Sequence, residues 1–330
     1  MGLKTAVLLA LLALVAGCAG APKREAPGPA TPAASAGGKT PTPSPSPTRA
    51  AVGGDGTYRV GETQQTFTEP AHTSPTGQHL GQRKLVTQIW YPLLSGLTGP
   101  LPLLVFAPGF LQCSDAYSYL LQAWASAGYV VAAVNFPRTN CDLGANADEA
   151  DLVNQPADMS YVLSGLLAES TRPNGTFSGL LDAHEVAAAG QSDGGDTVAA
   201  LAANTCCTDR RLKAVAVLSG AEWPKPGQYF SGGAPPALFV QGSADTVNPP
   251  WASLQLYRAD SAGIRYYLDL FGASHLGPYE GTNPVERRVA RITLAFFDRY
   301  VLGQADALET MTRDGNAGGS ALVSGGRTPP

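Results

Sequence analysis

The sequence predicts an α/β domain with a mostly parallel central sheet, helices on both faces and no large cap domain. From about residue 57 onward, short β-rich runs alternate with helical stretches, and several of the runs are apolar along their whole length. Strands of this kind are buried on both faces, which is typical of parallel sheets covered by helices. The connections between the runs are short, and none is long enough to form a separate cap.

The predicted elements follow one another in a regular order. Residues 58–67 and 84–91 are rich in β-branched and aromatic residues, and we expect them to form a hairpin. Further strands are predicted at 101–107, 129–134, 186–189, 212–218, 237–240 and 265–270. Helices are predicted at 115–127, 147–169, 195–203, 251–259 and 284–301. Residues 303–330 are mostly small and polar, and they predict a flexible C-terminal tail.

The first 17 residues predict a signal peptide. Lys4 provides a positive charge, and residues 6–15 form an apolar run that is too short to span a bilayer. The small residues before Cys18 resemble the lipobox of bacterial lipoproteins, in which the cysteine becomes the lipid-carrying N-terminus. An ordinary secretory signal with a chance cysteine is the alternative. A lipid on Cys18 would hold the protein on a membrane surface, so we expect an exported protein of the cell envelope.

Residues 18–56 differ in composition from the rest of the chain. They consist mainly of alanine, proline, serine, threonine and glycine. Such a stretch buries too little apolar surface to offset the entropy of ordering it, so we expect a disordered linker. The predicted organisation is a signal peptide (1–17), a lipidated cysteine with its linker (18–56), an α/β domain (57–302) and a tail (303–330).

Charge and residue spacing exclude some classes of function. Lysine and arginine number 22 against 26 aspartate and glutamate, the net charge is −4, and no cluster of basic residues occurs. The chain therefore lacks the electrostatic footprint of a nucleic-acid-binding protein. No group of histidine, cysteine and carboxylate residues has the spacing of metal ligands, so we expect neither a metal nor another cofactor.

Beyond Cys18 the chain has four cysteines, an even number in a compartment where disulfides form. A bridge between Cys113 and Cys141 is plausible if their loops meet. That bridge would leave Cys206 and Cys207 as a vicinal disulfide or as free thiols. Crossed pairings are also open, because spacing alone does not determine connectivity.

A Gly-x-Ser-x-Gly motif, formed by Gly190, Ser192 and Gly194, lies between a predicted strand and a predicted helix. The bare pattern is weak because glycine is frequent in this chain. Its context is more specific, since a sharp turn from a strand into a helix lifts the serine hydroxyl above the sheet. We interpret Ser192 as a nucleophile. The alternative is a glycine-rich turn in which Ser192 only caps the helix.

A serine nucleophile requires a base, and the chain has four histidines. His72 and His79 lie between the first two predicted strands, and His184 precedes the strand that leads to the motif. His275 follows the predicted strand 265–270 in a loop of small residues, at a strand end where catalytic residues of open α/β sheets gather. His275 is therefore the predicted base, with an exposed loop histidine as the alternative.

The acid that orients this base is expected between Ser192 and His275 in the chain. Asp245 follows the predicted strand 237–240 and is the predicted acid, with an ordinary turn aspartate as the alternative. Three other acidic residues compete for the role: Glu222, Asp260 and Asp269. Asp269 lies inside the strand that leads to the histidine, which is a poor position for this role. The order serine, aspartate, histidine is typical of one hydrolase arrangement.

From about residue 85 to residue 302, these features resemble the α/β-hydrolase superfamily. The details are most similar to its dienelactone-hydrolase-like and platelet-activating-factor-acetylhydrolase-like branch, which includes secreted lipases, cutinase-like polyester hydrolases and chlorophyllases. In that branch a strand ends in a His-Gly-Phe type turn, which matches residues 106–110 (FAPGF) here. The resemblance implies an oxyanion hole formed by the backbone N–H groups of Phe110 and Asp193. Pro108 replaces the usual histidine of the turn, and Gln191 replaces a frequent histidine before the nucleophile.

Three large aromatic residues, Phe110, Trp223 and Trp251, lie in loops that follow predicted strands. We interpret them as walls of a substrate pocket for an apolar acyl or aryl group. The alternative is that they pack beneath their own loops. Without a cap the site would be open, and open sites favour bulky or polymeric esters over small metabolites.

The sequence thus predicts an esterase- or lipase-like serine carboxylic ester hydrolase that acts through Ser192, His275 and Asp245 by an acyl-enzyme mechanism at the cell envelope. One alternative is a peptidase or amidase with the same triad. Another is a non-catalytic lipoprotein of the same fold that binds an envelope component. The expected partners are a small-molecule or polymeric ester and the membrane reached through Cys18. We expect a monomer.

Overall fold

The computed structural model describes residues 58–74, 76–93, 100–223 and 226–326. The predicted signal peptide, Cys18 and the linker lie outside these residues. Among the residues described, no helix has the length and apolarity that crossing a membrane would require.

The strands are β1 (Arg59–Glu69), β2 (His72–Thr73), β3 (His79–Leu80), β4 (Arg83–Leu93), β5 (Leu101–Ala107), β6 (Val130–Asn135), β7 (Leu181–Gln191), β8 (Leu212–Leu218), β9 (Ala237–Gly242), β10 (Ile264–Leu270) and β11 (Ser320–Gly326). The helices are α1 (Ser118–Ser126), α2 (Gln155–Thr171), α3 (Asp193–Ala203), α4 (Pro250–Ala259), α5 (Pro284–Tyr300) and α6 (Ala307–Gly315). Three short 3₁₀ helices are η1 (Ser114–Tyr117), η2 (Cys141–Asn146) and η3 (Glu149–Asn154).

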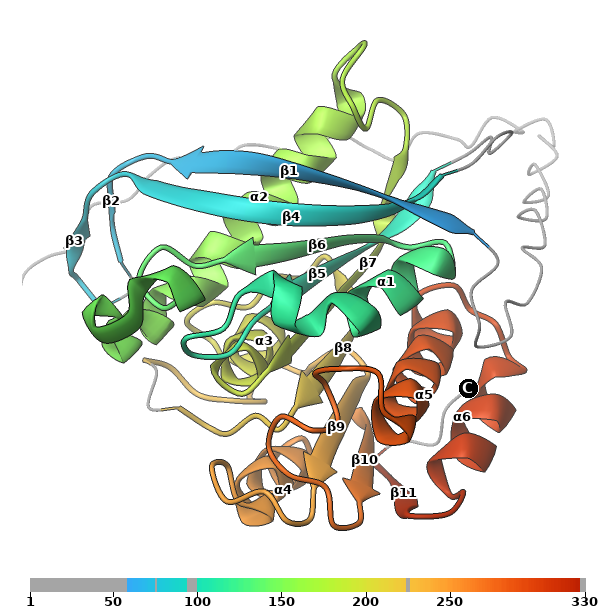
Figure 1. Cartoon of the computed structure of the whole chain (residues 1–330). Coiled ribbons are helices and arrows are strands. Elements are labelled where there is room, and N and C mark those ends of the chain that lie inside the picture. Colours follow the sequence, from blue (N-terminus) through green and yellow to red (C-terminus); the bar gives the residue numbers. More distant parts are fainter. Residues whose placement is uncertain (1–57, 75, 94–99, 224–225, 327–330) are drawn as a thin grey trace, which may run out of the picture. The chain divides into compact units, whose positions relative to one another are not determined.

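Within the described residues, nine strands form one sheet in the order β1-β4-β6-β5-β7-β8-β9-β10-β11 (Figure 1). Every neighbouring pair from β6 to β10 is parallel, and the pairs β1–β4, β4–β6 and β10–β11 are antiparallel. The antiparallel pairing of β1 with β4 confirms the predicted hairpin. The mostly parallel sheet with helices around it confirms the predicted fold class.

Alternate side chains of the central strands enter two hydrophobic clusters, one on each face of the sheet. In β5, Leu104 and Phe106 belong to one cluster, whereas Leu103 and Val105 belong to the other. This period of two explains why the central strands are apolar along their whole length. Each large side chain buried in this way stabilises the fold by roughly 1.5–3 kcal/mol.

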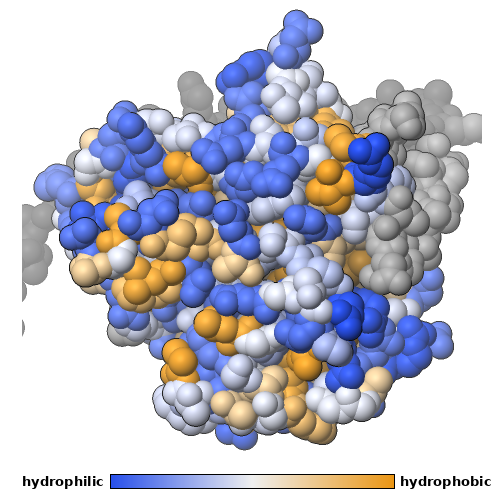
Figure 2. Space-filling view, in the orientation of Figure 1, coloured by the Kyte–Doolittle hydropathy of each residue, from blue (hydrophilic) through white to orange (hydrophobic). Residues whose placement is uncertain are grey.

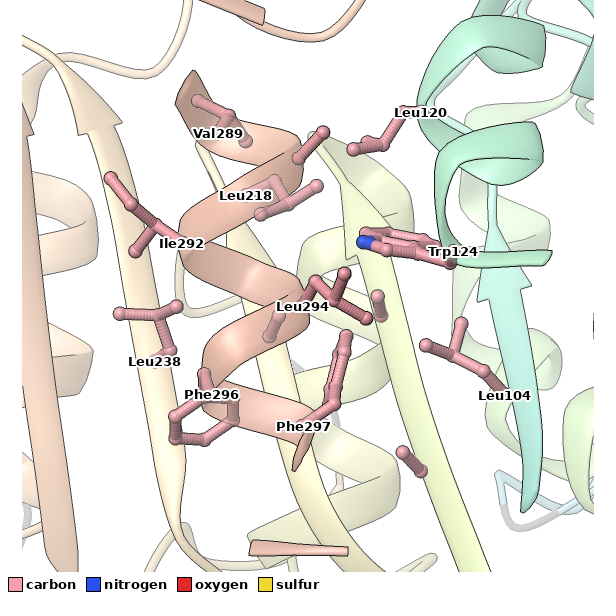
Figure 3. Packing of buried hydrophobic residues seen from close by; sticks show 14 of the residues in the cluster. Leu104, Leu120, Trp124, Leu218, Leu238, Val289, Ile292, Leu294, Phe296 and Phe297 are labelled. Carbon is pink, nitrogen blue, oxygen red and sulfur yellow. The ribbon is translucent and has the colours of Figure 1, made fainter. Parts of the chain in front are cut away.

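Helices α1 and α5 pack together on the face that holds the first cluster. Figure 3 shows Trp124 of α1 lying beside α5, close to Phe297. The two rings meet edge to face with their centroids 5.7 Å apart, and the Trp124 indole N–H donates to Thr293 Oγ1 at 3.0 Å. Residues of α2, α3 and α4 contribute to the second cluster on the opposite face.

The prediction of a flexible tail at residues 303–330 is wrong for most of that segment. Helix α6 buries Ala307 and Met311, four residues apart on one face, and Met311 belongs to the first core cluster. Strand β11 pairs antiparallel with β10, from Ser320 opposite Leu270 to Gly326 opposite Ile264. The domain therefore extends at least to Gly326, because this segment has both an apolar helix face and a sheet edge to join.

The loops after β5, β7, β8, β9 and β10 leave the same edge of the sheet, because these strands are parallel. Ser192, Asp245 and His275 each lie in one of these loops. Ligands of open α/β sheets bind at this carboxyl edge. The topology therefore brings residues together that are far apart in the chain.

Candidate active site

The Gly-x-Ser-x-Gly motif forms the turn between β7 and α3. Ser192 has φ 56° and ψ −125°, a strained conformation for a residue with a Cβ atom. The flanking glycines are required by packing. A Cβ at Gly190 would collide with the Gly194 backbone, and a Cβ at Gly194 would collide with the Ala107 carbonyl. The motif therefore specifies the sharp turn that exposes the serine hydroxyl at the end of the strand.

His275 connects Ser192 to Asp245. Its Nε2 lies 2.9 Å from Ser192 Oγ, and its Nδ1 lies 2.8 Å from Asp245 Oδ2. All three residues are buried to more than nine-tenths, with exposed fractions of 9% for Ser192, 8% for His275 and 3% for Asp245. The structure thus brings the three predicted residues into one hydrogen-bonded chain.

Asp245 is held by donors from its own loop and from β9. Its Oδ1 accepts the backbone N–H groups of Val247 and Asn248 at 2.9 and 3.0 Å. Its Oδ2 accepts a hydrogen bond from Gln241 Nε2 at 3.0 Å, in addition to its contact with His275. These bonds satisfy a buried carboxylate and fix the oxygen that faces the imidazole.

The other candidate bases and acids lie elsewhere. Glu222 accepts a hydrogen bond from the exposed Gln255 side chain, Asp260 follows α4, and Asp269 lies within β10. His72 and His79 lie in the small hairpin of β2 and β3, and His184 is an exposed residue of β7. None of these histidines takes the place of His275 beside Ser192.

The turn after β5 packs against Ser192. A Cβ placed on Gly109 would lie 3.1 Å from Ser192 Cβ and 2.8 Å from Gln191 Oε1, so only glycine fits this approach without a shift. The next residue is Phe110, whose N–H forms no hydrogen bond to any other part of the described chain. Asp193 is the first residue of α3, and the predicted nucleophile Ser192 is the N-cap residue of this helix.

A family model described as PET hydrolase-like matches residues 42–310. The chain belongs to the PET hydrolase-like family. Members of this family are serine carboxylic ester hydrolases of the α/β-hydrolase superfamily, so the predicted enzyme class and the predicted polyester-hydrolase relationship are confirmed. A comparison with curated protein sequences gives no significant match.

The predicted pocket residues of this PET hydrolase-like protein differ in exposure. Trp251, near the start of α4, is 66% exposed, whereas Phe110 and Trp223 are half-buried. Two exposed apolar residues that the sequence analysis did not name, Leu111 and Val247, follow Phe110 and Asp245 closely in the chain. Figure 2 shows that apolar residues form separate patches between hydrophilic ones on the face in view. With two thirds of its surface exposed, Trp251 does not pack beneath its own loop.

Two cavities of the described residues lie away from the triad. One lies along α6 beside Leu308 and Thr312, and the other lies between the β2–β3 hairpin and η3, beside His79 and Arg138. Neither contains a triad residue.

The structure pairs the four cysteines of the domain as Cys113–Cys141 and Cys206–Cys207. The first bridge joins the loop after β5 to η2, with Cα atoms 5.2 Å apart. Among the described residues, Cys113 and Cys141 also form, with Asp142, a cluster of three possible metal ligands. Because both sulfurs are already bonded to each other, this cluster does not have the thiolates that a metal would need.

Four buried polar residues lie near the triad in roles that no sequence motif indicates. Gln191 ends β7 and Gln241 lies near the end of β9, and both are fully buried. Tyr117 and Tyr279 are also buried. Burial raises the pKa of both phenols, which keeps them protonated as hydrogen-bond donors. In each strand the glutamine follows an apolar run, which is the signal that could have found the first two.

Proposed function

We propose that Ser192, His275 and Asp245 are the catalytic triad of this ester hydrolase. The observation that carries the proposal is the unbroken chain of hydrogen bonds from Ser192 Oγ through the imidazole to Asp245, built on a serine in a strained turn. A nucleophile in contact with a base that a third group orients is the arrangement required for acyl transfer.

Hydrolysis proceeds in two steps on this arrangement. His275 Nε2 takes the proton of Ser192 as Oγ attacks the ester carbonyl carbon, and Asp245 stabilises the imidazolium. The imidazolium then gives its proton to the departing alcohol as the ester C–O bond breaks, which leaves an acyl-enzyme. Water loses a proton to His275 and attacks the acyl carbon, releasing the carboxylic acid and restoring Ser192.

Two backbone donors stabilise the negative charge that develops on the carbonyl oxygen. They are the N–H groups of Phe110, in the turn packed against Ser192, and of Asp193, at the first turn of α3. Because both donors belong to the backbone, changes of the Phe110 side chain alter pocket shape more than oxyanion binding.

The substrate class that this site fits best is a bulky or polymeric ester with apolar acyl or aryl groups. Membership of the PET hydrolase-like family supports a polyester substrate. Trp251, near the start of α4, is largely exposed, and Trp223, in the loop after β8, is half-buried. Aromatic side chains in such positions offer flat apolar contacts to a chain that lies across an open surface.

The motif at Cys18 supports an exported protein held at the cell envelope by a lipid. The apolar run at residues 6–15 and the composition of residues 18–56 support the same placement. A membrane anchor would keep the enzyme at the cell surface, where polymeric substrates that do not enter a cell are hydrolysed.

The experiment that tests the function compares the protein with Ser192→Ala on p-nitrophenyl esters from acetate to long acyl chains and on an aromatic polyester film. We expect hydrolysis by the unmodified protein and a loss of roughly 10³-fold or more in the variant. The chain-length profile would size the acyl site. If the folded protein were as inert as the variant on every ester, the esterase function would be wrong, and peptide substrates would be tested instead.

A further inference from the structure

The residue before the nucleophile makes contacts that the triad does not require. Gln191 is fully buried, and its side chain reaches two other loops. Its Oε1 accepts a hydrogen bond from the Tyr117 hydroxyl at 2.8 Å. Its Nε2 donates to the carbonyl oxygen of His275 at 3.2 Å and lies 3.3 Å from His275 Nε2. One amide group therefore contacts both the base and the loop that carries it.

Tyr117 extends this connection to the turn after β5. The Gly109 N–H donates to the Tyr117 hydroxyl oxygen at 3.1 Å, and the Tyr117 side chain is fully buried against Phe106. A backbone N–H can only donate. The Tyr117 oxygen therefore accepts from Gly109, and its own hydrogen points to Gln191.

The same reasoning fixes the orientation of the Gln191 amide. The oxygen must face the Tyr117 hydroxyl, so the nitrogen must face His275, whose carbonyl oxygen can only accept. All three hydrogen bonds therefore run in one direction: Gly109 donates to Tyr117, Tyr117 donates to Gln191, and Gln191 donates to His275. They join the loops after β5, β7 and β10, which carry the proposed oxyanion donor, the nucleophile and the base.

We propose that Gln191 and Tyr117 are positioning residues that hold the Phe110 N–H and His275 in register with Ser192. The proposal rests on the proposed function, because it assigns the pair a part in the same reaction. Gly109 immediately precedes the oxyanion donor, so the Tyr117 bond fixes the backbone that aims the Phe110 N–H. The Gln191 bond fixes the backbone of His275 itself.

This role predicts a specific kinetic signature. A small displacement of an oxyanion donor or a base weakens interactions made only in the transition state, which lowers kcat and leaves KM nearly unchanged. Displacements of this kind cost roughly 10- to 100-fold in rate. A residue that only stabilises the fold would change the unfolding temperature without changing kcat of the folded enzyme.

The test uses Tyr117→Phe, Gln191→Met and the double variant, with Ser192→Ala beside them. Tyr117→Phe keeps the ring and removes one hydroxyl, and Gln191→Met keeps the approximate shape. We expect each single variant to lose roughly 10-fold or more in kcat on a soluble ester, with KM within about twofold. A boronic acid that forms a tetrahedral adduct with the serine is expected to bind more weakly by a similar factor.

The double variant tests whether the two residues act as one chain. We expect it to be no more than about threefold slower than the worse single variant, because both substitutions break the same connection. Tyr129→Phe is the matched control, since Tyr129 is equally buried and donates to Asp298 at 3.0 Å, but it precedes β6 at the sheet edge opposite the triad. It is expected to lower the unfolding temperature and to leave kcat unchanged.

Three results would overturn the positioning role. They are an unchanged kcat in folded Tyr117→Phe, a rise in KM alone, or single effects that multiply in the double variant. The proposed function fails separately. If the unmodified protein and Ser192→Ala were equally inactive, the triad assignment would be wrong. If Ser192→Ala alone lost activity, the triad would stand and the positioning role would be wrong.

Discussion

Ser192 combines a reactive side chain with a strained backbone. At φ 56° and ψ −125°, a residue with a Cβ atom is strained, whereas glycine adopts this conformation without that strain. We therefore expect Ser192→Gly to be more stable than Ser192→Ala by about 1 kcal/mol, although both variants lack the hydroxyl and are inactive. Chemical denaturation of the two variants measures the difference directly.

A matched pair at Ser243 provides the control for this comparison. Ser243 follows β9 and does not have a positive φ. Glycine there has no strain to relieve and a greater loss of entropy on folding, so Ser243→Gly is expected to be no more stable than Ser243→Ala. Equal stabilities of the two Ser192 variants would mean that the turn stores no strain at the nucleophile.

Glu286 makes the stability of the domain depend on pH. Its side chain is fully buried near the start of α5, and neither carboxylate oxygen has a hydrogen-bond partner among the described residues. Burial, followed by the nearby negative charge of Glu280, raises the pKa of Glu286 to about 7. Between pH 4.5 and 7, the Glu286 carboxyl is therefore protonated in the folded state and ionised in the unfolded state.

The sign of the effect follows from this difference. Below the unfolded pKa of about 4.5, Glu286 is protonated in both the folded and the unfolded state. As pH rises from there through 7, the free energy of unfolding decreases, because the folded state must finally bury a charged carboxylate. We expect Glu286→Gln to match the unmodified protein at pH 4.5 and to be more stable by roughly 1–3 kcal/mol at pH 8. Unfolding free energies at the two pH values give the comparison. A constant difference between the two proteins at both pH values would contradict the assignment.

At the scale of elements, the Cys113–Cys141 bridge joins the loop that carries Phe110 to η2. The Leu111 N–H also donates to the Thr139 carbonyl oxygen at 2.8 Å across the same contact. The bridge closes a loop with a sequence separation of 28, which corresponds to about 3 kcal/mol of stabilisation through the unfolded chain. Replacing both cysteines by serine is therefore expected to cost about 3 kcal/mol and to lower kcat, because the proposed oxyanion loop loses one of its attachments.

The second disulfide is the natural control for this prediction. Cys206 and Cys207 are adjacent, so their bridge closes no loop of comparable length. The corresponding double serine variant is expected to lose much less stability and to keep its kcat. If the two double variants behaved alike in unfolding and kinetic measurements, the loop attachment would not contribute to either property.

Helix α6 closes the first core cluster beside α5. Met311 is fully buried in this cluster, whereas Glu309 on the same helix is exposed. Met311→Ala is expected to cost about 2–4 kcal/mol in the free energy of unfolding, because it leaves a cavity in the core. Glu309→Ala is expected to cost less than about 0.5 kcal/mol. A negligible effect at Met311 would mean that residues 307–315 are the loose tail that the sequence predicts.

For the molecule as a whole, the sequence predicted features that depend on local patterns. The limits of β5 and β8 match the predicted runs because β5 is apolar along its whole length and β8 is apolar except at the exposed Lys213. The candidate triad was found because each member directly follows a predicted strand or lies in a glycine-rich turn. Parallel strands then place those ends together, so local patterns were enough to predict a shared site.

Other features depend on contacts that no local pattern reveals. Tyr117 and Gln191 are 74 residues apart, and their hydrogen bond exists only because the fold brings the end of η1 beside the end of β7. Strand β11 contains small residues and two glycines, and it is a strand because β10 offers it an open edge. The early part of β7 was missed because Asp182, His184 and Glu185 interrupt its apolar run.

The proposed placement of the whole protein at a membrane depends on a lipid at Cys18. All residues of the proposed active site lie between Phe110 and His275, so the chemistry does not require Cys18. Cys18→Ser is expected to move the exported protein from the membrane fraction to the soluble fraction, because the acyl chains would be its only proposed attachment. The specific activity of the variant on a soluble ester is expected to stay unchanged. The unmodified protein is expected to incorporate a labelled fatty acid, and the variant is not. Retention of the unlabelled Cys18→Ser variant in the membrane fraction would show that another part of the chain holds it there.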